Sequence, residues 1–126
     1  MSIEEYFSAI DVLFSSPIIL AVDIKKEKRS STIGIVYGCV TFINESNLSF
    51  MEYFEVEKTI QVKTYSYHYQ DLNGQMLFRY DNAPHYPQLK TFPNHKHLKS
   101  DTIESDQPDI AQVMNEIQSI IINKRK

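Results

Sequence analysis

Residues 64–81 read TYSYHYQDLNGQMLFRYD, and the Asn73-Gly74 pair near the middle of this stretch predicts a β-hairpin. Asn-Gly between two runs of β-forming residues is the strongest short hairpin signal, because both residues accept the positive φ angles of a tight turn. A two-residue loop at this point would pair Leu72 with Gln75. We therefore predict two antiparallel strands that meet at Asn73-Gly74.

The predicted register sorts the side chains of this hairpin onto two faces. It places His68 opposite Arg79 and Ser66 opposite Asp81. A three-residue bulged loop, 72–74, would shift the pairing by one residue and mix the two faces, so the two-residue loop is favoured. One face then carries an imidazole, a guanidinium and a carboxylate within reach of each other. That face holds Thr64, Ser66, His68, Gln70, Leu77, Arg79 and Asp81, and the other holds Tyr65, Tyr67, Tyr69, Met76, Phe78 and Tyr80.

The segments before and after the hairpin extend it into a larger fold. Apolar residues at helical spacing predict one helix from Ser2 to about Phe14 and another over about 108–122. A proline-containing loop, 83–98, precedes the second helix. Short links between the strands favour an antiparallel meander. The predicted class is α+β, a meander sheet of about five strands with the N-terminal and C-terminal helices packed on one face. The strands are expected at 18–25, 32–43, 48–56, 60–70 and 75–81.

Length and composition indicate a single domain, residues 1–126, with ordinary globular proportions of hydrophobic and charged residues. No apolar run approaches the roughly 20 residues needed to span a bilayer. Because Cys39 is the single cysteine, an internal disulfide is excluded, and we expect a cytoplasmic protein without a membrane segment. A net charge of −3 argues against indiscriminate nucleic-acid binding, although it allows a local basic site. Basic runs at 25–29 and 124–126 are interpreted as solvated surface.

All four histidines lie between positions 68 and 97. In an extended segment His95 and His97 would point to the same side, because alternate residues of a strand share a face. Together with His85 and His68 they could hold a zinc-type metal, since imidazole is a common ligand of such ions. The sequence lacks a second cysteine and an H-E-x-x-H motif. A site without any cofactor is therefore the favoured hypothesis, and the histidine metal site is its alternative.

The same segment contains the side chains needed for metal-independent RNA cleavage. That chemistry requires a base for the 2′-hydroxyl proton, an acid for the leaving oxygen and a cation for the phosphate. His68 and His85 could act as acid and base, while Arg79 could bind the phosphate. The candidate catalytic set is His68, Arg79, Asp81, His85, His95 and His97, and the candidate substrate-binding set is Tyr67, Tyr69, Asn82, Tyr86 and Lys96. The tyrosines of this second set could stack on bases, with core packing as the alternative.

Glu52 is a candidate supporting carboxylate. It falls on the apolar face of its predicted strand, between Phe50 and Phe54. A carboxylate is unfavourable in such a position unless it has a partner, and Arg79 is a candidate. A glutamate at the strand edge that points to water is the alternative.

Three segments, YHYQD (67–71), FRYDNAPH (78–85) and FPNHKH (92–97), resemble the TumE-like family, small prokaryotic proteins described as toxins of toxin–antitoxin pairs. The resemblance also includes Glu52 and the closing helix, and it covers most of the chain. The family often has paired histidines after the proline of each loop motif. Here these pairs read His85-Tyr86 and Asn94-His95. If the missing histidines serve catalysis or metal binding, this copy is weakened.

The resemblance implies the toxin of a type II toxin–antitoxin pair, with a cognate antitoxin encoded nearby. An endoribonuclease acting on RNA is the favoured activity, and a homodimer is left open. One alternative is a non-enzymatic module that binds protein or nucleic acid through the aromatic hairpin. The other is a metal-binding regulatory domain centred on His85, His95 and His97.

Overall fold

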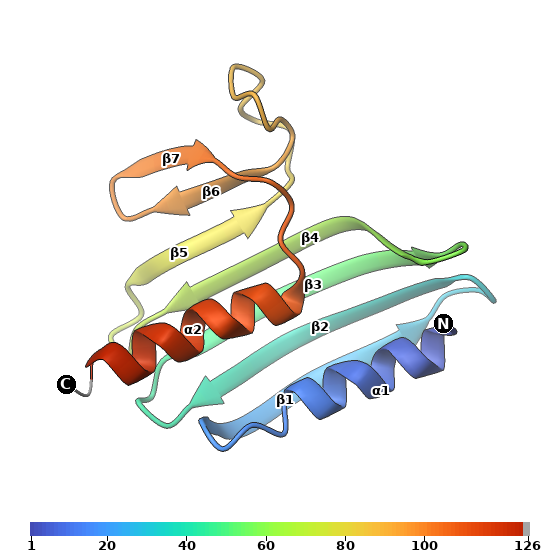
Figure 1. Ribbon diagram of the computed structural model, residues 1–126, viewed down its shortest axis with the longest axis horizontal. Helices are drawn as coiled ribbons and strands as arrows, with labels where there is room; N and C mark the ends of the chain where they lie inside the picture. Colours follow the sequence, from blue (N-terminus) through green and yellow to red (C-terminus); the bar gives the residue numbers. More distant parts are fainter. Residues whose placement is uncertain (125–126) are drawn as a thin grey trace.

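Seven antiparallel strands lie in the sheet in the same order as in the chain, so the sheet is a simple meander (Figure 1). The structure is a computed structural model that describes residues 1–124; Arg125 and Lys126 of the basic tail lie outside the described residues. The strands are β1 (Ile19–Lys28), β2 (Ile33–Phe42), β3 (Asn47–Val56), β4 (Ile60–Gln70), β5 (Met76–Asp81), β6 (His95–Leu98) and β7 (Asp101–Glu104).

Two helices, α1 (Ile3–Leu13) and α2 (Ile110–Lys124), cover one side of this sheet (Figure 1). The α+β class, the meander and the placement of both helices on one face are confirmed. The five predicted strands are all present as β1 to β5. The sheet is nevertheless larger than predicted, because β6 and β7 form where a loop was expected to run into the second helix. None of the helices within residues 1–124 is long and apolar enough to cross a membrane.

Side-chain caps define the start of each helix. The Ser2 hydroxyl accepts a hydrogen bond from the Glu5 amide, and the Glu5 carboxylate accepts one from the Ser2 amide, which together form a capping box. Asp109 and Gln112 make the same reciprocal pair before α2. The first helical residue is therefore Ile110, and Pro108 precedes the helix instead of occupying its first turn.

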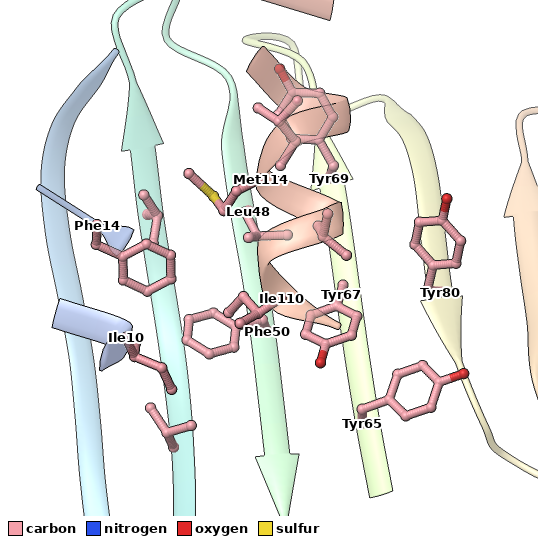
Figure 2. Close-up of a cluster of buried hydrophobic side chains, with 14 of the residues drawn as sticks. Ile10, Phe14, Leu48, Phe50, Tyr65, Tyr67, Tyr69, Tyr80, Ile110 and Met114 are labelled. Carbon is pink, nitrogen blue, oxygen red and sulfur yellow. The ribbon is translucent and has the colours of Figure 1, made fainter. Parts of the chain in front are cut away.

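The hydrophobic core lies between the two helices and one face of β2 to β5. Aromatic rings fill much of this layer, and Figure 2 shows the tyrosines of β4 lined up beside Phe50 of β3. Ile10 and Phe14 reach the layer from α1, and Ile110 and Met114 reach it from α2. The opposite face of the sheet has no helix over it within the described residues.

The hairpin between β4 and β5 has a loop different from the predicted one. The Asp71 amide donates to the Gln75 carbonyl oxygen, and the Gly74 amide donates to the Asp71 carbonyl oxygen. Gly74 has a φ of 80°. These bonds describe a three-residue loop that ends in a left-handed glycine, so the two-residue prediction was wrong. Asn73-Gly74 marks the turn but does not fix its length.

A second irregularity restores the predicted register. Gln70 pairs with Met76, but Tyr69 pairs with Phe78, so β5 has one extra residue between these pairs. Such a bulge offsets the additional loop residue. The expected pairs of His68 with Arg79 and of Ser66 with Asp81 are therefore confirmed. The faces of Met76 and Leu77 were exchanged in the prediction, because Leu77 packs against the core and Met76 lies opposite Gln70.

Candidate functional site

A row of three charged or titratable side chains crosses β4, β5 and β6 on the helix-free face. His68 lies opposite Arg79, and Arg79 lies opposite His97. Because side chains opposite each other in paired strands share a face, the guanidinium stands between two imidazoles. We call these three residues the cationic row. It exists only because β6 adds His97 to the predicted hairpin.

A second row, Ser66, Asp81 and His95, runs beside the first on the same face. Asp81 is buried and connects the two rows. Its carboxylate accepts a hydrogen bond from Arg79 Nε at 2.9 Å and lies 2.9 Å from His95 Nε2. The Nε2 atom of His97 is 3.5 Å away. A single carboxylate therefore organises an arginine and two histidines.

Each of these two histidines has a second polar neighbour that fixes its ring. Nδ1 of His95 lies 2.9 Å from the Pro93 carbonyl oxygen, and Nδ1 of His97 lies 3.1 Å from the Thr102 hydroxyl. The two Nε2 atoms are 3.1 Å apart. The Tyr86 ring packs against both imidazoles, with centroid distances of 4.8 Å and 5.7 Å. The rings are thus held from several sides, and His95 is 1% exposed.

The environment of the cationic row favours neutral imidazoles. Burial and the neighbouring Arg79 charge lower the pKa of His68. Burial also lowers the pKa of His97, although the Asp81 carboxylate opposes this effect. Arg79 Nη1 lies 3.5 Å from His68 Nδ1. Since a guanidinium has only donors, Nδ1 of His68 is the accepting nitrogen and Nε2 carries the proton of the neutral ring.

A pocket of about 630 Å³ opens beside these rows. Ser66, Arg79 and Asp81 contribute polar groups to its lining. Lys63 adds a second cation to the lining, and Phe92 adds an aromatic ring that is 43% exposed. Clefts with converging polar groups and a few apolar walls are typical ligand sites. The two rows and this pocket together form the candidate site, which we call the open-face site.

Several predicted residues reach this site and others do not. His68, Arg79, Asp81, His95, His97 and Tyr86 lie together. His85 is exposed on the loop after β5 and is outside the Asp81–His95–His97 cluster. Asn82 lines the pocket and also has a structural role, because its side-chain oxygen accepts from the Tyr65 amide and its side-chain nitrogen donates to the Lys63 carbonyl oxygen.

Three predicted substrate contacts lie on the wrong face of the sheet. Tyr67 and Tyr69 are 0% exposed and point toward the helices, as Figure 2 shows. They cannot stack on bases in the folded protein, so the core alternative is correct. Lys96 alternates with His95 and His97 and therefore also faces the helices, where it pairs with Glu116 of α2 at 2.8 Å. These positions were misassigned because residue type was given more weight than strand alternation.

Glu52 is buried as predicted, but its partner is not Arg79. The Tyr6 hydroxyl donates to Glu52 Oε1 at 2.5 Å, and the Tyr67 hydroxyl donates to Oε2. Burial raises the pKa of the Glu52 carboxyl, and these two hydrogen bonds oppose the rise. Glu52 and Arg79 are separated by the sheet itself, because their side chains lie on opposite faces. Glu52 therefore supports the core and does not touch the open-face site.

Thr102, Lys63 and Phe92 belong to the site but were not singled out from the sequence. Thr102 lies opposite His97 in the β6–β7 pair. The residues between these strands are Lys99 and Ser100, which give no hairpin signal. Thr102 could have been found only by predicting that residues 95–98, His-Lys-His-Leu, form a strand and that this strand pairs with the residues after Ser100.

The fold and the open-face site define the class of protein to which the chain belongs: a two-layer α+β domain whose free sheet face carries clustered histidine, arginine and aspartate side chains. The family described as Toxin TumE matches residues 9–125, and the chain belongs to this family. The resemblance stated from the sequence is thereby confirmed, and a member of this toxin family is expected to pair with an antitoxin. No curated protein and no solved structure matches the chain.

Proposed function

We propose that this TumE-family protein is the toxin of a type II pair that cleaves RNA at the open-face site without a metal ion. The observation that carries the proposal is the cationic row, in which Arg79 stands between the imidazoles of His68 and His97. Cleavage of RNA needs two proton-transfer groups on either side of a phosphate and a cation on the phosphate itself. The row provides these three groups in a line.

The proposed step is an internal transfer of the phosphate. Arg79 binds the two non-bridging oxygens of the phosphate through its guanidinium. His68 accepts the proton of the 2′-hydroxyl, the 2′ oxygen bonds to phosphorus, and the bond to the 5′ oxygen breaks. His97, in the protonated form that the Asp81 carboxylate favours, donates a proton to that leaving oxygen. The products are a 2′,3′-cyclic phosphate and a free 5′-hydroxyl, so no water, oxidant or cofactor is consumed.

The surroundings of the row support an RNA substrate. Lys63 and Arg79 give the pocket local positive charge on a chain whose net charge is −3. The exposed ring of Phe92 can stack on a base, which is how proteins commonly hold single-stranded RNA. The buried tyrosines of β4 remove the aromatic surface on which the alternative of a non-enzymatic docking hairpin was based.

Growth arrest and RNA cleavage test this proposal together. Expression of the wild type should arrest growth, and the purified protein should release fragments with 2′,3′-cyclic phosphate ends in the presence of a chelator. His68→Ala and Arg79→Ala should each lower the cleavage rate by about 100-fold or more. Co-expression of the protein encoded by the adjacent reading frame should restore growth.

Arg29→Ala is the matched control for the arginine variant. Arg29 is exposed in the turn between β1 and β2, where it pairs with Glu27. It should arrest growth and cleave RNA like the wild type. Full toxicity of both His68→Ala and Arg79→Ala, each verified to be folded, would overturn the assignment of the site.

A further inference from the structure

We propose that Asp81, His95 and His97 bind one divalent transition-metal ion of the Zn²⁺ type. Within residues 1–124 they form the one group of three or more potential ligands whose donor atoms converge, all within 4.8 Å of one another. Two imidazole nitrogens and a carboxylate oxygen are a ligand set that zinc and iron(II) accept. This set differs from the one expected from sequence spacing, because Asp81 takes the place of His85.

The distances between the donor atoms match those of a metal centre. His95 Nε2 lies 3.1 Å from His97 Nε2 and 2.9 Å from Asp81 Oδ1. His97 Nε2 lies 3.5 Å from Asp81 Oδ2. Ligands bound tetrahedrally with bonds of about 2.0–2.1 Å are about 3.3 Å apart. An ion can therefore bond to both imidazole nitrogens and to one oxygen of the Asp81 carboxylate with only small side-chain movements.

The outer nitrogens of the two histidines are arranged as in metal sites. A histidine that ligates a metal through one nitrogen commonly holds a backbone carbonyl, a carboxylate or another polar group with the other. His95 Nδ1 is paired with the Pro93 carbonyl oxygen and His97 Nδ1 with the Thr102 hydroxyl. Because a carbonyl oxygen only accepts, Nδ1 of His95 carries a proton. Nε2 of His95 is then the nitrogen that faces Asp81 Oδ1 and His97 Nε2, where a metal ion would bind.

Three protein ligands leave a coordination position for water, as in many catalytic zinc sites. A bound ion would use Nε2 of His97, so the metal-bound form and the form that transfers protons through His97 are alternative states of the same residues. The binding itself is independent of the proposed RNA cleavage. Its test therefore uses metal binding and thermal stability, which do not depend on any activity.

The experiment titrates chelator-treated full-length protein with Zn²⁺ by calorimetry and with Co²⁺ by visible absorption. The wild type should bind about one ion per chain and show a higher Tm with Zn²⁺, but not with Mg²⁺, which prefers oxygen ligands. His97→Ala and Asp81→Asn should each bind at least about 10-fold more weakly. His97 is the safer position, because its side chain is 23% exposed and its truncation leaves the core intact.

His85→Ala is the matched control, since it also removes an imidazole from this part of the chain but is exposed and outside the cluster. It should bind Zn²⁺ like the wild type. Absence of Zn²⁺ binding by the wild type would overturn the proposal. Equal weakening by His85→Ala and His97→Ala would also overturn it, because the ion would then be held by the loop histidines.

Discussion

Glu52 is an acidic residue with no solvent exposure in the middle of an apolar layer. Its hydrogen bonds to the hydroxyls of Tyr6 and Tyr67 tie helix α1 to strands β3 and β4. Asp109, just before α2, adds a negative charge nearby and also raises the pKa of Glu52, after burial as the main cause. A buried carboxylate with two hydroxyl donors and a like charge close by should make the stability of the protein depend on pH.

The sign of this dependence follows from the direction of the pKa change. The folded pKa of Glu52 is above its ordinary value of 4.5, so the folded state favours the protonated form. The contribution to stability is complete below about pH 4.5 and is lost as the pH rises through the folded pKa. Glu52→Gln removes the charge; its amide oxygen accepts from one tyrosine hydroxyl, and its amide N–H donates to the other hydroxyl, which turns to accept. Relative to the wild type, this variant should gain stability as the pH rises above about 4.5, on the order of 1 kcal/mol or more.

Denaturant unfolding at several pH values measures this difference. Glu52→Ala is the companion variant, because it leaves the two tyrosine hydroxyls without their partner. It should be less stable than the wild type by about 1–3 kcal/mol for each hydroxyl that stays buried. A Gln variant whose stability relative to the wild type stays constant across the pH range would contradict the expectation.

At the scale of single elements, Gly38 sets how closely β1 and β2 approach. It has a φ of 148°, and a Cβ atom there would lie 2.2 Å from the Asp23 carbonyl oxygen and 2.6 Å from the Ile24 Cα. Both of these neighbours are backbone atoms of β1, which cannot move aside as a side chain can. Gly38→Ala should therefore destabilise the protein by about 3–5 kcal/mol, from overpacking and backbone strain together.

Gly74→Ala separates these two causes. Gly74 also has a positive φ, 80°, but a Cβ atom there would meet nothing within 4 Å. Gly74→Ala should therefore lower the free energy of unfolding by about 1–2 kcal/mol, from backbone strain alone. Equal losses for Gly38→Ala and Gly74→Ala in thermal or denaturant unfolding would show that close packing between β1 and β2 is unimportant.

Alternation and turn signals predicted the five strands from β1 to β5 because each combines β-forming residues with a half-buried face. They did not predict β6 and β7, whose four-residue segments are polar and short. Such strands form through backbone hydrogen bonds to the neighbouring strand, and the pattern of side chains in the sequence does not indicate that pairing. The loop length of the β4–β5 hairpin was missed for a related reason, since the bulge at Leu77 offsets it without any residue preference.

The site residues that lie on the β4–β5 hairpin could be predicted from the sequence, whereas those that depend on the pairing of β6 could not. His68, Arg79 and Asp81 were placed correctly because they lie on adjacent strands joined by a recognisable turn. The positions of His95 and His97 depend on β6, so their contact with Asp81 followed only from the structure. Residue chemistry alone was a poor guide, as the burial of Tyr67 and Tyr69 shows.

At the scale of the whole molecule, contacts on the helix face of the sheet position strand β6, which carries the histidines of the open face. β6 carries His95 and His97 on the open face and Lys96 on the helix face. Lys96 pairs with Glu116 of α2 at 2.8 Å and lies over the Tyr80 ring, 4.7 Å from its centroid. Burial disfavours the Lys96 ammonium, but hydrogen bonds to Glu116 and Tyr80 outweigh this and raise its pKa. Helix α2 therefore positions the strand that completes the cationic row.

This coupling predicts that loss of Glu116 loosens the β6–β7 end of the sheet. Glu116 accepts hydrogen bonds from both Lys96 and the Tyr80 hydroxyl, so Glu116→Ala leaves two half-buried donors without a partner. Loss of these two hydrogen bonds should lower the free energy of unfolding by about 1–3 kcal/mol. Hydrogen exchange should rise by about tenfold or more in β6 and β7, while β1 and β2 keep their protection.

The exposed pair between Asp11 and Lys26, with a distance of 2.5 Å, provides the control for this variant. Exposed ion pairs contribute little, so Asp11→Ala should change stability by less than about 1 kcal/mol and leave exchange in β6 and β7 unaltered. If Glu116→Ala instead raised exchange uniformly over the sheet, α2 would stabilise the fold as a whole and not the strand bearing the histidines. A selective rise, together with weaker growth arrest, would link the helix face directly to the geometry of the open-face site.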